Sequence, residues 1–341
     1  MKIFRTMMAS VLTLSAVCAC EKEIRFVGDY DGEKLVMYAT ANTDSTLYAD
    51  LFKSKFIMSD DDESVFKPKS GAKVTAEVGG RTITLEEVAS MPGSYSSDYR
   101  PVPGETIVIN ASVPGLPPVS SCVTVPQKPD FKLEVMGKTL EDADEGSNFG
   151  RVRVNLRLTI KDRPGEHDCY NIQMLEKSEY QLEFGGREWT GQALYSNDVI
   201  FRSPDDTFEM IEDAVNGTTY VWVERPFDDQ AFDGETHVFD LWFEVWVSRH
   251  QELYYSNGDP GEEAADPDIP LTDLVDLSSF RFEIDAISED IYLYEKTLAA
   301  YNGDELMEFF GEPVSIHNNI TGGIGCFGAV APSYIDLNGT E

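Results

Sequence analysis

Two segments of this chain alternate apolar and polar residues with a period of two, and this pattern constrains the fold more than any other feature. The first segment covers residues 151–160, and its apolar positions are Val152, Val154, Leu156, Leu158 and Ile160. The second covers residues 237–247, and its apolar positions are Phe239, Leu241, Phe243, Val245 and Val247. Successive side chains of a strand point to opposite faces of the sheet, so each segment predicts a strand with one buried face.

Residues 34–128 are expected to form a first all-β domain. Residues 35–39, 105–113 and 120–125 have strand composition, and residues 73–78 and 81–85 flank Gly79-Gly80, a two-residue hairpin signal. About 95 residues of short strands are typical of an immunoglobulin-like or a prealbumin-like sandwich. A proline-rich linker at 125–130 separates this domain from the rest.

Residues 129–341 are expected to form a larger β-rich domain with one or two packed helices. A hairpin is predicted around Gly185-Gly186, and residues 280–284 suggest a further strand. The clearest helix begins at Ser288 as N-cap and continues at helical spacing until Gly303. Shorter helices are predicted at residues 208–215 and 304–310.

The first residues have the layout of a secretory signal peptide. Lys2 and Arg5 precede an apolar stretch that closes on Cys18-Ala19-Cys20. A small residue directly before a cysteine indicates bacterial lipoprotein processing after residue 19, which would leave Cys20 as an acylated N-terminus carrying fatty chains such as palmitate. Residues 1–19 are then the signal peptide and 20–33 a tether. The alternative is an ordinary signal peptide with incidental cysteines.

The acid excess limits the classes of partner. The formal charge is −34, and removal of Lys2 and Arg5 with the signal peptide takes it to −36. Such a surface repels phosphate backbones and anionic headgroups, so nucleic acid is excluded as a partner. Divalent cations, neutral ligands and basic proteins remain, and the lipid would hold the protein to the membrane.

Neither cysteine nor histidine placement predicts a metal or catalytic centre. After Cys20 the chain has Cys122, Cys169 and Cys326, which allow at most one disulfide and are expected to be buried thiols. The four histidines are scattered, and the Gly-x-Ser-x-Gly pattern of a hydrolase nucleophile is absent from the sequence. We therefore expect no enzyme, although abundant carboxylates leave an acid/base pair as an alternative.

Residues 322–328, Gly-Gly-Ile-Gly-Cys-Phe-Gly, have the glycine content of a phosphate-binding loop. They lack its lysine and its Ser/Thr, and no strand-then-helix unit surrounds them. In a β-rich chain such glycines are typical of bulges and of close backbone approach, so we expect them to have a structural role.

Two acidic segments could bind calcium, which takes six to eight oxygens in flexible loops. The first is residues 59–64, and the second contributes Asp259, Glu262, Glu263, Asp266 and Asp268. Neither has the residue order of an EF-hand, so a solvated acidic loop is the default interpretation and calcium binding the alternative. The second loop is the stronger calcium candidate.

The outward side of the strand predicted at 237–247 carries Asp240, Trp242, Glu244 and Trp246. Two tryptophans outside a core require a cover. A second sheet, a helix or the first domain would supply it structurally, whereas planar rings flanked by acids suit sugars or a cationic peptide. Arg151, Arg153 and Arg157 share the outer side of the other strand, where cross-strand pairing with the acids is one explanation and an anion site is another.

Several segments resemble a family of Bacteroidetes outer-membrane lipoproteins, a domain of unknown function numbered four-two-four-nine. Residues 310–329 read FGEPVSIHNNITGGIGCFGA and match the family's glycine-rich ending. Residues 162–166 (DRPGE), 227–234 (FDDQAFDG) and 287–294 (ISEDIYLY) match three further family segments, and 93–95 (GSY) a fourth. Cys326 stands where an aliphatic residue is usual, and the acidic stretch 259–268 is an insertion.

The resemblance covers nearly the whole mature chain and implies an outer-membrane lipoprotein associated with a TonB-dependent transporter. It supplies no catalytic residues. The acidic start Glu21-Lys22-Glu23 resembles signals that send such lipoproteins to the cell surface. The expected function is a non-enzymatic ligand-binding or accessory protein of the transporter. A structural or adhesive surface module is the alternative, and a hydrolase with an unrecognised carboxylate site is a third.

Overall fold

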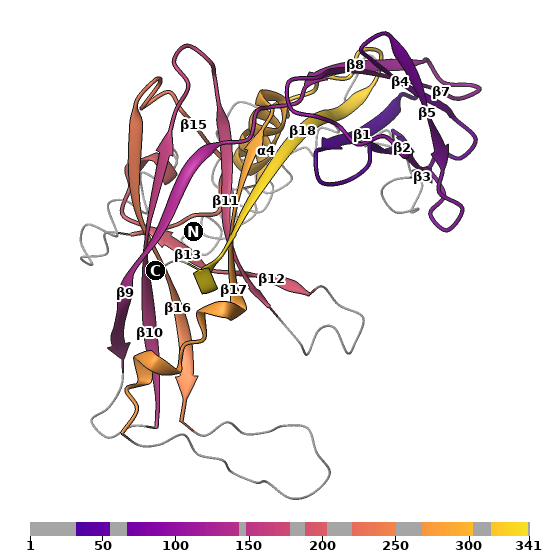
Figure 1. Cartoon of the computed structure of the whole chain (residues 1–341). Coiled ribbons are helices and arrows are strands. Elements are labelled where there is room, and N and C mark those ends of the chain that lie inside the picture. Colours follow the sequence, from indigo (N-terminus) through magenta and orange to yellow (C-terminus); the bar gives the residue numbers. More distant parts are fainter. Residues whose placement is uncertain are drawn as a thin grey trace, which may run out of the picture. The chain divides into compact units, whose positions relative to one another are not determined.

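The computed structural model describes residues 32–54, 67–142, 148–177, 188–202, 220–249, 268–302 and 315–339. The described part is mostly β, which confirms the predicted fold class. Most of its strands and its helix are labelled in Figure 1. The elements are β1 (Leu35–Asn42), β2 (Tyr48–Lys53), β3 (Lys67–Pro68), β4 (Lys73–Val78), β5 (Arg81–Glu87), β6 (Ser94–Ser96), β7 (Thr106–Ser112), β8 (Val119–Thr124), β9 (Asp130–Asp142), β10 (Phe149–Lys161), β11 (Cys169–Lys177), β12 (Trp189–Gln192), β13 (Leu194–Ser196), β14 (Val221–Trp222), β15 (Phe227–Asp228), β16 (Thr236–Ser248), β17 (Phe280–Ile287), α4 (Glu289–Asn302) and β18 (Ile324–Asp336), with short 3₁₀ turns at Val199–Phe201, Leu271–Leu274, Leu277–Ser279 and Leu337–Gly339.

The first β unit is built as the sequence predicts. The predicted hairpin forms between β4 and β5, and both turn glycines have positive φ, 54° at Gly79 and 78° at Gly80. That backbone suits the primed two-residue turns, which only glycine and a few polar residues adopt without strain. β5 pairs with β4 and also with β6, so it continues from one side of the buried core to the other. The buried core of this unit contains side chains from β1, β4 and β7.

The second core depends on the alternation in β10 and β16. These strands pair antiparallel over their whole length, in a five-stranded sheet of order β14-β13-β16-β10-β9. The apolar side chains of residues 152, 154, 156, 158 and 160 are all buried, and they pack with inward residues of β11 and β17. Burial of each such aliphatic side chain contributes about 1.5–3 kcal/mol, so this register is strongly favoured.

The last strand, β18, belongs to both cores. Its residues 324–330 pair parallel with β1, and its residues 330–336 pair antiparallel with β17. Phe327 and Ala329 are buried with the first core, whereas Ala331 is buried with the second. The division into residues 34–128 and 129–341 remains a prediction, and the C-terminal segment adds a strand beside the first of these ranges (Figure 1).

The glycines of residues 322–328 allow close packing, which confirms their structural reading. A Cβ atom on Gly325 would lie 2.0 Å from the carbonyl oxygen of Met37 in β1, and φ is 130° there. A Cβ on Gly323 would lie 2.4 Å from the Leu35 carbonyl oxygen. A Cβ on Gly328 would lie 2.0 Å from the Ile291 side chain of α4. The segment is the contact through which β18 meets β1 on one side and the helix on the other.

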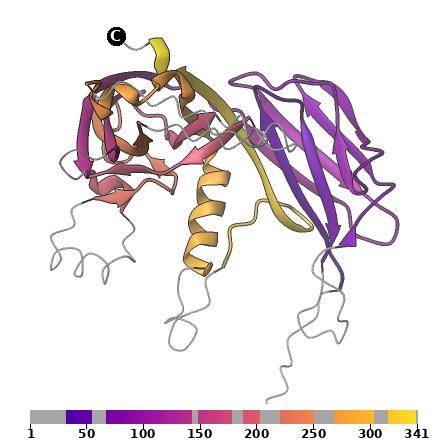
Figure 2. The ribbon, with the colours of Figure 1, turned by 90° about the horizontal axis from the view of Figure 1, so that it is seen from below.

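The predicted helix is present as α4, which lies beside β18 (Figure 2). Ser288 precedes it, and its carbonyl oxygen accepts a hydrogen bond from the Tyr292 amide at 3.1 Å. The Ser288 hydroxyl accepts from the Ala329 amide of β18 at 3.1 Å, so it fixes the start of the helix to the strand. The helices predicted at 208–215 and 304–310 lie outside the described residues, as does the turn at Gly185-Gly186, whose strands β11 and β12 do pair. Among the helices that are described, none has the length and apolar content that crossing a bilayer requires.

The expectation that all three cysteines after Cys20 are buried is wrong for one of them. All three are free, but only Cys169 and Cys326 are buried, whereas Cys122 is exposed on β8. It alternates outward between the buried Ser121 and Val123, and the strand period therefore overrides the usual preference of cysteine for the interior. Burial raises the pKa of the Cys169 and Cys326 thiols to about 12, so both stay protonated.

Replacement of Gly325 by alanine should lower the free energy of unfolding by about 2–4 kcal/mol, because the new Cβ meets the Met37 carbonyl and φ is positive. Urea denaturation followed by circular dichroism measures the loss. Gly191→Ala is the matched control, since its Cβ would meet nothing within 4 Å, and its effect should stay within about 0.5 kcal/mol. Equal stability of the two variants would contradict this account of the glycine-rich segment.

Candidate functional site

The outer face of the five-stranded sheet, opposite its buried core, carries a ladder of polar and aromatic pairs. The register sets Arg151 opposite Trp246, Arg153 opposite Glu244, Asn155 opposite Trp242 and Arg157 opposite Asp240. This follows from the alternation itself, because burial of the even positions of β10 turns every odd position outward. The side chains of residues 240, 242, 244 and 246, which the sequence predicts to bind a ligand, therefore lie together with the three arginines.

Ion pairs account for these arginines. Arg157 Nη2 lies 2.9 Å from Asp240 Oδ1, and Arg151 Nη1 lies 3.0 Å from Glu244 Oε2. Arg153 Nη2 lies 3.4 Å from Glu244 and 3.3 Å from Glu141 of β9. These contacts confirm the cross-strand pairing explanation, and each guanidinium charge is compensated by a carboxylate within 4 Å.

The two tryptophans have different surroundings. Trp242 is 7% exposed, and it is covered by the Arg153 guanidinium at 4.9 Å from the ring centroid, by the stacked ring of Tyr195 and by Tyr220. Trp246 is 64% exposed, with the Arg151 guanidinium 6.0 Å from its centroid. The expected cover by a sheet, a helix or the first domain is therefore wrong for Trp242, because neighbouring side chains of its own sheet cover it.

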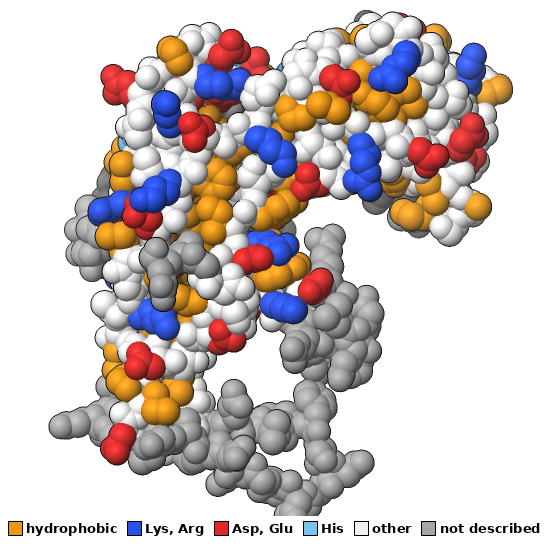
Figure 3. Space-filling view, viewed as in Figure 1, with side chains coloured by type: hydrophobic (Ala, Val, Ile, Leu, Met, Phe, Trp, Pro, Cys, Tyr) orange, Lys and Arg blue, Asp and Glu red, His pale blue; other side chains and the backbone are white. Residues whose placement is uncertain are grey.

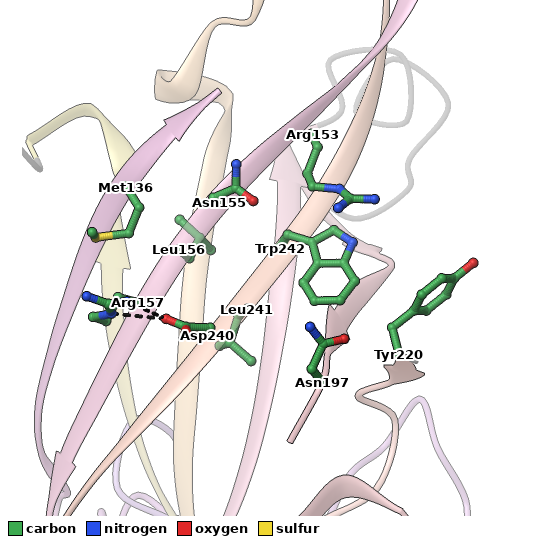
Figure 4. Close-up of a pocket in the computed structure, with 10 residues that line it drawn as sticks. All are labelled: Met136, Arg153, Asn155, Leu156, Arg157, Asn197, Tyr220, Asp240, Leu241 and Trp242. Atoms are coloured by element: carbon green, nitrogen blue, oxygen red, sulfur yellow. Dashed lines mark hydrogen bonds and ion pairs between the residues drawn. The ribbon is translucent and has the colours of Figure 1, made fainter. Parts of the chain in front are cut away.

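A hollow of about 370 Å³ opens on this outer face, and Figure 4 shows ten residues that line it. We call it the outer hollow; its wall and floor include Met136, Asn155, Asn197, Tyr220, Asp240 and Trp242. Gly137 of β9 lies opposite Asn155, and the register shifts by one residue directly after this pair. A glycine at a bulge leaves the space beside Asn155 without a side chain, so the irregularity of β9 makes room for the hollow.

Two of the four predicted ligand-binding residues, Asp240 and Trp242, line the outer hollow, whereas Glu244 and Trp246 lie further along β16 and do not. Asn155, Asn197, Tyr220 and Met136 were not predicted. The sequence offers one signal for them, since Asn155 interrupts the arginines at 151, 153 and 157 on the outward side of its strand. Nothing in the sequence indicates that Asn197 and Tyr220 come to the same place.

Charges of both signs are mixed on the visible surface. On the face of the molecule that Figure 3 shows, basic and acidic side chains are interspersed with apolar ones and are not segregated by sign. The Nε atoms of Arg151 and Arg153 are buried and have no hydrogen-bond partner within the described part of the chain. Their positive charge is held above tryptophan rings, where the ring quadrupole stabilises a cation.

Most of the predicted calcium ligands lie outside the described residues, namely Asp259, Glu262, Glu263 and Asp266, as do residues 59–64. Asp268 is described and is exposed. A calcium site in the acidic loop stays a prediction.

The structure brings together another acidic group, which the sequence did not single out. Asp162, Asp168 and Asp229 are buried, and carboxylate oxygens of all three lie within 4.8 Å of one another. Oxygens of this kind are what calcium and magnesium prefer. Each carboxylate already has a protein partner, however: Asp168 bonds Arg163, Asp162 accepts from the Gly234 amide at 2.8 Å, and Asp229 accepts from the Asp168 amide at 2.8 Å.

This group is best explained as a buried hydrogen-bond network. It ties residues 162–168 to the loop 228–234. These ranges overlap two of the segments that resemble the family. Burial raises the pKa of the Asp229 carboxyl, so the network carries a cost that the amide and guanidinium donors offset.

The carboxyl groups of Glu283 and Asp285 on β17 are relevant to the alternative that the protein is an enzyme with an acid/base pair. Burial, together with the neighbouring Glu283 and the more distant Asp44 and Glu295, raises the pKa of Asp285 to about 7. Oδ1 of Asp285 is buried and has no hydrogen-bond partner among the described residues. The Glu283 carboxyl accepts a hydrogen bond from the Gln173 amide at 3.1 Å, and burial raises its pKa as well. Asp285 therefore titrates near neutral pH.

Asp285→Asn should raise the unfolding temperature at pH 8 and leave it nearly unchanged at pH 4. An ordinary aspartate has a pKa near 3.9, so the unfolded chain loses this proton before the folded chain does. The stability that Asp285 contributes is then present below about pH 4 and is lost as the pH rises to about 7. Asparagine imitates the protonated form and removes this loss.

Asp336→Asn is the control of opposite sign, because the Arg281 guanidinium lowers the pKa of Asp336. Its stabilising effect is present above the unfolded pKa and is lost on acidification, so the variant should be less stable than the parent at pH 8. Thermal unfolding followed by circular dichroism between pH 4 and pH 8 measures both. An Asp285→Asn gain that is the same at every pH would refute the assignment.

A comparison with protein-family models matches residues 21–334 to the family described as "Domain of unknown function (DUF4249)". No curated protein matches the chain.

Proposed function

Because the chain belongs to the DUF4249 family, which is defined by sequence and not by activity, we propose a function from its leader and its outer face. The protein is an outer-membrane lipoprotein, anchored through acylated Cys20 and facing the cell exterior. It binds a ligand without transforming it and serves as an accessory partner of a TonB-dependent transporter.

The observation that carries the binding role is the outer hollow. It combines apolar and polar groups on the outer face of a five-stranded sheet, and its volume of about 370 Å³ falls within the range of roughly 300–1,000 Å³ that small-molecule sites occupy. The strands around it pack on the largest core of the molecule, so its walls are supported from below. A preformed site of this kind binds without first ordering its own residues.

The lining groups favour binding over catalysis. Asp240 is exposed and its Oδ1 is bonded to the Arg157 guanidinium, which holds the carboxylate in place. The amides of Asn155 and Asn197 orient ligands but neither take up nor release protons at neutral pH. A hydrolase would instead need a nucleophile or a proton-transferring group within reach of the bound molecule.

One observation favours the second candidate, a structural or adhesive module that binds a protein. Phe149 is 61% exposed, and it lies next to the exposed Trp246 on the adjoining strand of the same outer face. Exposed aromatic side chains that lie together are typical of protein contact surfaces. A transporter partner that covers this end of the sheet would accommodate both candidates.

Cys20→Ala should abolish lipid attachment and move the protein from the membrane fraction to the soluble fraction of native cells. Mass spectrometry of the wild-type N-terminus should find a fatty-acylated cysteine as the first residue, since residues 1–19 are removed. Cys18→Ala is the matched control and should leave processing and fractionation unchanged. An intact leader, or a mature terminus without fatty chains, would refute the anchor and the location.

Purification of the lipidated protein from native outer membranes in mild detergent should bring a TonB-dependent barrel with it in a fixed ratio. Mass spectrometry of the complex identifies the barrel, and surface proteolysis of intact cells tests which side the protein faces. Recovery of the protein alone, at yields that recover known barrel complexes, would refute the transporter role but not ligand binding.

A further inference from the structure

The outer hollow contains polar groups that bond no other residue of its lining. Figure 4 shows the side-chain amides of Asn155 and Asn197 without a hydrogen bond to any other residue that lines the hollow, while Asp240 is bonded to Arg157. Each amide offers both a donor and an acceptor. A ligand that satisfies both must itself carry donors and acceptors on neighbouring atoms, as a pair of hydroxyl groups does.

The arginine charges around the hollow are already paired with carboxylates of the protein. The guanidinium groups of Arg153 and Arg157 are each bonded to carboxylates, at 3.3 Å and 2.9 Å respectively. An anionic ligand would have to displace these acids, and it would approach a chain of net charge −34. A cationic ligand would find the position above Trp242 already taken by Arg153, 4.9 Å from the ring centroid. A neutral ligand meets neither obstacle.

The rim of the hollow is apolar. Tyr220 is 43% exposed and presents a planar ring, and Met136, 52% exposed, lies on the other side with a flexible side chain. Aromatic rings at a binding site stack on apolar ligand faces, while the tyrosine hydroxyl remains available for hydrogen bonds. The hollow therefore suits a molecule that has an apolar face and a hydrogen-bonding edge.

From these three features we infer that the outer hollow binds a neutral saccharide. The C–H face of a sugar ring packs on Tyr220 and Met136, and its hydroxyl groups bond the amides of Asn155 and Asn197 and the free oxygen of Asp240. The inference rests on the proposed ligand-binding role and names the class of ligand that this role serves.

The test uses the lipidated protein purified in detergent and an array of neutral oligosaccharides: glucans, mannans, galactans and xylans of two to eight units. Binding to at least one of them is expected, and isothermal titration with that oligosaccharide then measures the Kd. Asn155→Ala should raise the Kd about tenfold or more, and Tyr220→Ala about fivefold, since lost hydrogen bonds and lost ring contacts of this kind have effects of that size.

Trp246→Ala is the matched control, because this exposed ring lies on the same strand as Trp242 but outside the hollow, and its Kd should stay within about twofold. Circular dichroism and the unfolding temperature confirm that Asn155→Ala and Tyr220→Ala are folded. A variant that does not fold is replaced by Asn197→Ala, at an exposed position, for which a severalfold rise in Kd is expected.

Several outcomes would overturn the inference. Absence of binding to every neutral oligosaccharide at millimolar concentration would do so, as would binding that is insensitive to changes at residues 155, 197 and 220. Binding of an anionic glycan or a basic peptide that Asn155→Ala weakens would refute the saccharide class but retain the ligand-binding role. Failure of the ligand-binding role itself is distinguishable, because no class of ligand would then depend on the hollow residues.

Discussion

The register between β10 and β16 is the constraint on which the candidate site depends. Burial alternates along the whole of β10, which pairs with β16 over its full length, so a shift of one residue would turn valines and phenylalanines to solvent and arginines into the core. The free energy that fixes this register comes from the buried side, from residues such as Val154 and Phe243. The outer face, with Asn155 opposite Trp242, is a geometric consequence of that burial. The site is therefore positioned by the core beneath it, and two core residues, Leu156 and Leu241, also line the hollow.

A similar logic governs the C-terminal strand. β18 and the residue before it approach β1 and α4 too closely for a side chain at three positions, and Gly323, Gly325 and Gly328 stand there. The glycine-rich ending quoted for the family resemblance thus has a packing explanation that requires no ligand. The departure at Cys326 agrees with it, because that side chain is buried, as the aliphatic residue usual there would be, with Sγ 3.7 Å from the Asp290 carbonyl oxygen.

Local pattern predicted most of the fold. The alternating strands, the hairpin at Gly79-Gly80 and the helix after Ser288 depend on interactions within a few residues, and each is present. What the sequence could not reveal depends on contacts between distant segments. Trp242 and Trp246 lie on the same side of their strand. Trp242 is buried because Tyr195 and Tyr220, from other parts of the chain, pack against it. The hollow needs the bulge at Gly137, and the acidic network needs residues 162–168 to meet 228–234.

The ion pairs of the outer face offset, around the site, the excess of acidic residues in the chain. In a protein of net charge −34, ion pairs around a site lower the electrostatic cost of replacing its water by a neutral molecule. On the outer face Arg153 and Arg157 form such pairs, each with acids of adjoining strands. Exposed pairs of this sort contribute little to folding stability, about 0–1 kcal/mol each. Three arginines on one strand of an acidic protein are better explained by what they do to the surface than by what they add to the fold.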